Sequence, residues 1–97
     1  VAVITVRREL ADQFRDYERS VATILGRHGG RIERTVVVPA SDDRETFREI
    51  HLIRFPDRDG FAAFQADPSR AELDPLRRSL IVETTILVGE DGPDYGP

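Results

Sequence analysis

Two residues close together in the sequence, His51 and Glu49, are the clearest candidates for chemistry in this chain of 97 residues. They lie two positions apart in a segment that predicts a strand, so their side chains share one face of a sheet. An imidazole titrates near neutrality and can act as a general acid or base. A carboxylate beside it favours the charged imidazole, whereas burial opposes it. A structural interpretation stays open, in which a neighbouring carboxylate or a water simply satisfies the histidine within a dimer interface.

The other candidate residues each have an ordinary structural explanation as well. Tyr17 lies on the apolar stripe of a predicted helix, where a core position competes with ligand contact. Arg77, which follows Pro75 and Leu76, can bind a carboxylate through its planar guanidinium, but a surface ion pair is the better explanation. His28 lies at a predicted helix C-terminus, where the helix dipole favours a cation. Strand alternation alone adds further residues to the face that carries His51: Glu33, Thr35, Glu83 and Thr85.

The composition excludes most other kinds of active site. The chain has no Cys, Lys, Met, Trp or Asn, and all 14 of its cations are arginine. Disulfides, thiolate nucleophiles, iron–sulfur ligation, Schiff-base lysines and the lysine of phosphate-binding loops are therefore excluded. Two separated histidines do not indicate a metal site, and no glycine-rich phosphate loop precedes a predicted helix. We therefore expect neither a cofactor nor a metal.

The charge and hydropathy pattern bears on partners and location. A formal net charge of −4 argues against nucleic-acid binding, which needs a clustered basic face. No apolar run approaches the ~18 residues of a membrane span, and the first residues predict a strand rather than a signal segment. We expect a cytoplasmic protein with no nucleic-acid or membrane partner.

The hydrophobic pattern predicts the element order β-α-β-β-α-β. The predicted strands cover residues 1–7, 31–38, 46–55 and 80–88. Apolar residues recur at helical spacing from 10 to 28, and two glycines end that helix. A second helix lies between Pro56 and Pro68, and 69–79 is a helical or turn-like segment broken at Pro75. This order predicts one α+β, ferredoxin-like domain over 1–89, a four-stranded antiparallel sheet with both helices on one face, followed by a flexible acidic tail at 90–97.

One face of such a sheet lacks a cover. In strand 46–55 we assign the face with Ile50 and Leu52 to the helices. We assign the opposite face to the open side, where it carries Phe47, Glu49, His51, Ile53 and Phe55. That much apolar surface on so small a chain predicts a second copy packed sheet to sheet, which gives a homodimer.

Several short motifs make the chain similar to a known group of proteins. They are Phe55-Pro56-Asp57, Phe61-Ala62-Ala63-Phe64, Asp67-Pro68, Pro75-Leu76-Arg77 and Val88-Gly89. With the element order, they resemble a family of uncharacterised dimeric α/β-barrel proteins related to the antibiotic-biosynthesis monooxygenases and the muconolactone isomerases. The resemblance implies two ferredoxin-like chains whose sheets form one barrel, with a small-molecule cavity in each subunit.

The resemblance also implies roles for particular residues. The monooxygenase relatives carry a polar and an aromatic residue four apart on the third strand, both facing the cavity, and His51 and Phe55 occupy those places. Many relatives carry an aromatic residue where this chain has Arg70, so a ligand contact made by that ring is not expected here.

Two functional hypotheses follow. The first is a small-molecule-binding protein that acts as a cofactor-independent monooxygenase- or isomerase-like enzyme on an aromatic or apolar organic substrate. His51 then serves as the acid or base, Phe55 and Ile53 as the apolar wall, and Arg77 or Glu49 as the orienting charge. The alternative is a non-catalytic structural or ligand-binding homodimer. A ligand site needs an open cavity of roughly 300 Å³ or more, and a structural dimer fills that space with side chains. The sequence does not decide whether the protein is an enzyme.

Overall fold

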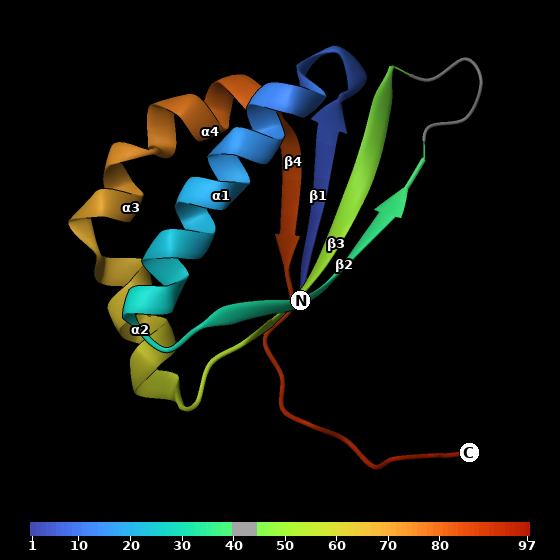
Figure 1. The fold of residues 1–97 in the computed structure, drawn as a ribbon, viewed down its shortest axis with the longest axis vertical. Coiled ribbons are helices and arrows are strands. Elements are labelled where there is room, and N and C mark those ends of the chain that lie inside the picture. The colour runs from blue at the N-terminus through green and yellow to red at the C-terminus, as the bar shows by residue number, and fades with distance from the viewer. Residues whose placement is uncertain (40–44) are drawn as a thin grey trace.

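Four antiparallel strands form one sheet in the order β2-β3-β1-β4, and the helices cover one of its faces (Figure 1). The computed structural model describes residues 1–39 and 45–97. The strands are β1 (Ala2–Arg7), β2 (Arg31–Val38), β3 (Thr46–Arg54) and β4 (Ile81–Ile86). The helices are the 3-10 turn η1 (Arg8–Leu10), then α1 (Ala11–Arg27), α2 (Arg58–Ala66), α3 (Pro68–Glu72) and α4 (Asp74–Leu80). This arrangement confirms the predicted α+β, ferredoxin-like fold.

Helix α1 supplies most of the cover of the sheet. Its apolar stripe is buried, as the helical spacing predicts: Phe14, Tyr17, Ile24 and Leu25. Phe14 meets Phe47 of β3 edge to face, with ring centroids 6.4 Å apart. The helix ends where Gly29 adopts a φ of 77°, a left-handed conformation that glycine enters without steric cost.

Three short helices, α2, α3 and α4, follow β3. The sequence predicted a helix break at Pro75, and the structure differs from that prediction. The Asp57 carboxylate caps α2 by accepting from the Gly60 backbone N–H at 2.8 Å, and Asp67 caps α3 in the same way. Pro75 lies in the first turn of α4 rather than ending a helix. Proline suits that position because an N–H in the first turn has no helical acceptor and its fixed φ is already helical.

The face that the helices cover is the opposite of the one assigned from the sequence. Ala2, Ile4 and Val6 of β1 are buried under the helices, and Ala2 pairs with His51. The side that carries Phe47, Glu49, His51 and Ile53 is therefore the helix side, and Phe55 just beyond it packs among the helices too. Leu52 lies on the open face, 45% exposed. Alternation shows which side chains share a face, but the choice of the covered face depends on packing that alternation does not contain.

Two irregular pairings explain why strict alternation also misplaces residues in the edge strands. The β2 register shifts between Ile32 and Arg34, so Ile32 and Thr35 both lie on the helix side. A second shift, between Thr5 and Val6 in the pairing with β4, leaves Glu83 opposite Thr5 on the open face. Glu83 is therefore on the other side of the sheet from His51, contrary to the shared cavity face expected for it.

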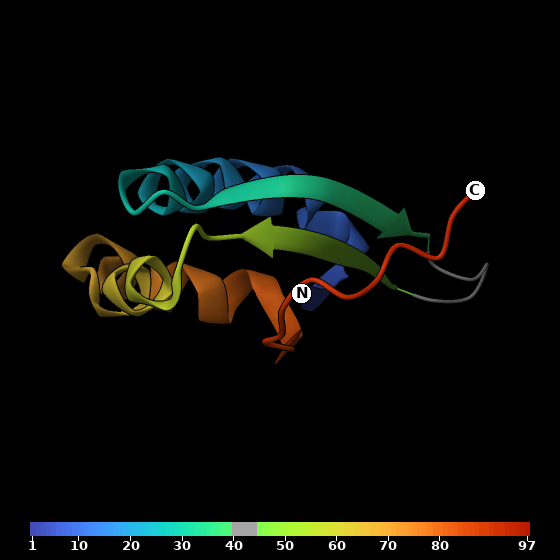
Figure 2. The same ribbon diagram turned by 90° about the horizontal axis from the view of Figure 1, so that it is seen from below.

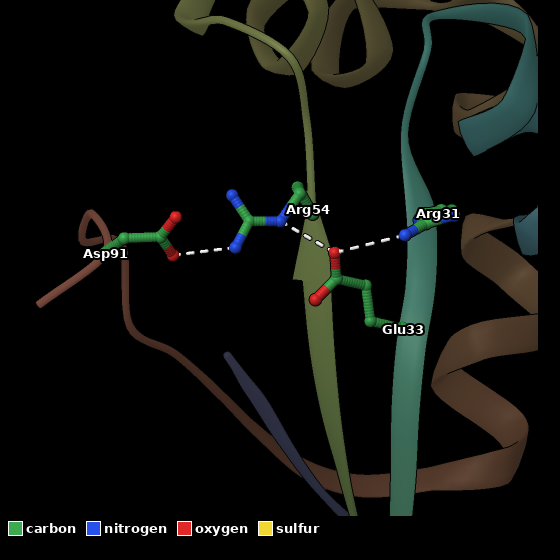
Figure 3. Close-up of polar contacts among 4 residues, drawn as sticks. All are labelled: Arg31, Glu33, Arg54 and Asp91. Carbon is green, nitrogen blue, oxygen red and sulfur yellow. Dashed lines mark hydrogen bonds and ion pairs between the residues drawn. The ribbon is translucent and has the colours of Figure 1, made fainter. Parts of the chain in front are cut away.

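The segment after β4 contains no helix or strand and extends away from the helices, on the side of the open face (Figure 2). It is held by Asp91, whose carboxylate accepts from Arg54 at 2.7 Å (Figure 3). Arg54 also donates to Glu33 at 2.7 Å, and Arg31 lies on the same carboxylate at 3.5 Å. Within the described ranges, no helix is both long and apolar enough to cross a membrane.

Candidate functional site

An open cavity of about 230 Å³ lies where α1 crosses the edge of the sheet. Helix α1 lies against β1 and the edge strand β2, most of whose residues are nevertheless exposed. The cavity is lined from three elements: Arg15, Glu18, Arg19 and Ala22 of α1, Ile32 and Thr35 of β2, and Glu49 and His51 of β3.

The imidazole of His51 is buried in the wall of this cavity, only 2% exposed. Its Nε2 lies 2.7 Å from Oε1 of Glu49, the neighbour two positions back on the same strand face. Because an ionised carboxylate only accepts hydrogen bonds, Nε2 carries the proton in this contact. In the neutral tautomer with its proton on Nε2, the other ring nitrogen, Nδ1, has a lone pair.

A second carboxyl group, that of Glu18, approaches His51 from the helix. Its Oε2 lies 3.7 Å from Nδ1, too far for a direct hydrogen bond, and its side chain is 13% exposed. Burial raises the pKa of Glu18 to about 7; the neighbouring His51 lowers it and Glu49 raises it. Glu18 therefore exchanges its proton near neutral pH, beside an imidazole at the cavity wall.

Three of the predicted site residues are brought together at the cavity: His51, Glu49 and Thr35. Ile53 packs against the hydrophobic core instead. Phe55 forms an aromatic group with Phe61 and Phe64, with ring centroids 5.5 and 5.8 Å away. Neither of these two side chains lines the cavity, so its apolar wall consists of other residues.

The remaining predicted residues lie elsewhere. Tyr17 is buried in the core, and burial raises the pKa of its phenol to about 12. Arg77 pairs with Asp74 on its own helix at 3.4 Å. His28, expected to be explained by a helix dipole, also has a specific partner: Asp67, with Nε2 and Oδ2 2.7 Å apart.

The residue in the position where many relatives have an aromatic also has a structural role. The guanidinium of Arg70 lies over the ring of Phe64, 5.6 Å from its centroid. This contact links α3 to α2, and Arg70 is not among the residues that line the cavity.

Sequence reasoning missed five of the cavity residues, which are the charged Arg15, Glu18 and Arg19 and the apolar Ala22 and Ile32. For Glu18 a signal exists in the sequence. It lies four residues after Phe14 and seven before Leu25, in the same apolar stripe of α1. A carboxyl group within a buried helix face is unusual and usually has a polar partner. Glu18 could therefore have been predicted from the sequence as a candidate neighbour of His51.

No group of three or more His, Asp or Glu side chains in the described part of the chain is arranged to hold a metal ion. The three titratable groups at the cavity are one imidazole and two carboxyls.

Comparison with solved structures supports the architecture. The fold is similar to that of SnoaB, a cofactor-independent oxygenase from Streptomyces nogalater, with a TM-score of 0.61. The two are 16% identical in sequence, and the match covers 94% of this chain and 91% of that one. The likeness defines this protein as an α+β protein with the fold of that oxygenase, which confirms the expected resemblance for the fold.

The sequence itself identifies the family. Residues 2–90 match the model of the domain of unknown function DUF1330, and the chain belongs to that family. No curated protein matches the chain in sequence.

Proposed function

We propose that this protein is an acid–base enzyme that removes a proton from a small organic molecule bound in the cavity between α1 and β3. The observation that carries the proposal is the buried imidazole of His51, which lies between two carboxyl groups at the wall of an open cavity. The fold shared with a cofactor-independent oxygenase supports a monooxygenase- or isomerase-like reaction. Such a reaction needs a base and no resident cofactor.

The three titratable groups take different parts in this proposal. Glu49 accepts from Nε2 and fixes the orientation of the ring. Nδ1 of His51 accepts a proton from an acidic O–H or C–H group of the ligand, which becomes an anion. Glu18, with its pKa of about 7, takes the proton on or returns it once a small movement of its side chain closes the 3.7 Å between its Oε2 and Nδ1. Return of the proton to another atom of the ligand gives an isomerisation. For an oxygenation at a CH2 carbon, dioxygen is the oxidant: the carbanion and dioxygen form a C–O bond, the resulting peroxide takes up the proton, and loss of water from the hydroperoxide leaves one oxygen atom on the ligand as a carbonyl.

The cavity limits the size of the ligand. At about 230 Å³ it is smaller than the roughly 300 Å³ expected of a ligand site from the sequence, so the proposal is confined to molecules of about one ring. Its apolar contacts come from Ile32 and Ala22 rather than from Phe55 and Ile53. The substrate class is therefore a small, partly apolar molecule with one acidic proton.

Proton removal can be tested on a panel of small acidic compounds. Small phenols, enolisable ketones and lactones are incubated with the protein in D2O. Proton NMR then measures the loss of the acidic C–H signals as deuterium replaces hydrogen; in the phenols these hydrogens are on the ring carbons. An oxygen electrode measures the consumption of dioxygen in the same samples. We expect exchange for some of these compounds, reduced about 100-fold or more in His51→Gln. His28→Gln is the matched control, because His28 pairs with Asp67 outside the cavity lining, and it should keep the activity.

Each outcome of this experiment decides between the hypotheses. Exchange without dioxygen uptake indicates an isomerase-like enzyme, and uptake indicates an oxygenase. Equal exchange by the wild type and a folded His51→Gln variant would remove His51 from the mechanism. If compounds bind in the cavity and none exchanges, the protein is the alternative, a non-catalytic ligand-binding protein.

We further propose that a second copy of the chain covers the open face of the sheet, as a homodimer. The support is a patch of apolar side chains in the middle of that face, from three adjacent strands: Val3, Val36, Val38, Ile50 and Leu52. Leu52→Glu should give a monomer by sedimentation, whereas Leu76→Glu, on α4 and equally exposed (44% against 45%), should not. A monomeric wild type would contradict the proposal.

A further inference from the structure

Two arginines of α1, Arg15 and Arg19, line the same cavity as the proton-handling groups. They are four residues apart, so they lie on successive turns of one helix face. Both residues are exposed, which places their charged ends at the mouth of the cavity rather than within it. Two guanidinium groups one turn apart can hold a single planar anion such as a carboxylate.

Within the protein, these two arginines form only exposed ion pairs. The Arg15 guanidinium lies 3.7 Å from the carboxylate of Asp12, which is 97% exposed. Arg19 donates to Asp16 at 2.6 Å, and both of those side chains are largely exposed. Exposed pairs of this kind contribute little energy and can be exchanged for a ligand anion.

The inner wall of the cavity has the opposite character. Glu49 and Glu18 flank His51 there, and an ionised carboxylate of a ligand is repelled by them. A ligand with one carboxylate is therefore favoured in a single orientation. Its anionic end lies at the arginines, and its neutral end lies against the imidazole.

We propose that the cavity takes small organic acids, held by Arg15 and Arg19 through their carboxylate, with the acidic C–H or O–H group turned toward His51. This inference rests on the proposed function, because it names the substrate class of that same cavity. Arg15 and Arg19 are then the residues that determine specificity for an anion, and the imidazole is the group that meets the reacting proton.

The test compares ligands of equal size that differ in charge. Benzoate and benzamide, and cyclohexanecarboxylate and its amide, are titrated into labelled protein while NMR follows the His51 ring and the backbone amides of α1. We expect the acids to bind at least tenfold more tightly than their amides. The double variant R15Q/R19Q should lose this preference, and R27Q, on the same helix but bonded to Ser69, should keep it.

The outcomes separate the inference from the proposed function. If acids and amides bind equally at the His51 ring, the cavity remains a ligand site and the anion inference is wrong. The inference also fails if R15Q/R19Q keeps the preference for acids. If none of the four compounds shifts the His51 resonances, the cavity is not a site for small organic molecules, and the proposed function falls with the inference.

Discussion

Replacing Glu18 with glutamine should stabilise the protein by an amount that grows as the pH rises. Glu18 is a carboxyl group buried beside His51 and Glu49, with Arg15 and Arg19 on its own helix. Burial raises its pKa from 4.5 to about 7. Folding therefore favours the protonated form, and the ionised form is costly in the folded protein. Glutamine keeps the size and polarity of the side chain without the ionisation.

The sign and the size of the effect follow from the linkage between proton binding and folding. A carboxyl group with a raised pKa in the folded state contributes stability that is fully present below pH 4.5 and is lost as the pH rises through about 7. At about 1.36 kcal/mol for each pKa unit, the shift corresponds to about 3 kcal/mol. The advantage of Glu18→Gln over the wild type should therefore grow by about 3 kcal/mol between pH 4.5 and pH 8.

Urea unfolding followed by circular dichroism measures this difference, at one protein concentration and at several pH values from 4 to 8.5. Glu72→Gln, the same change at an exposed residue of α3, is the control and should show a nearly constant difference from the wild type. A constant difference for Glu18→Gln across this range, or one that falls with pH, would refute the idea that burial makes the ionised form of Glu18 costly.

Two further predictions concern the parts of the fold that hold the helices to the sheet. Gly30→Ala should destabilise the protein by about 1–3 kcal/mol, because the added Cβ would lie 2.5 Å from the ring of Phe55. Gly26→Ala is the matched control: its Cβ would have no atom within 4 Å, and the change should stabilise α1 by up to about 1 kcal/mol. Equal effects of the two changes in chemical unfolding would contradict this packing. Asp67→Ala should destabilise the protein at neutral pH, because the hydrogen bond from His28 holds the pKa of Asp67 below its usual 3.8 and the carboxylate also caps α3. The loss should shrink as the pH falls below 3.8, and an undiminished loss at pH 2.5 would be inconsistent with the contact.

The local pattern of the chain determined the elements and their order. The spacing of Phe14, Tyr17 and Leu25 predicted α1, and the glycine at 29 marked its end, because both signals depend only on neighbours within a few turns. The two-residue spacing of Glu49 and His51 likewise placed both on one face, and the structure joins them by a hydrogen bond. These properties arise from backbone geometry and need no distant partner.

Only the tertiary structure decided which face of the sheet the helices cover and which groups meet there. Glu49 and His51 made their face resemble the open one, yet both are buried under α1, because each satisfies the other through a 2.7 Å hydrogen bond. Glu18, from the distant segment α1, completes this polar wall with its Oε2 3.7 Å from Nδ1. The register shift in β2 moved Ile32 onto the same wall. The choice of the covered face is a property of packing between segments far apart in the chain, so the side-chain pattern of a single strand cannot contain it.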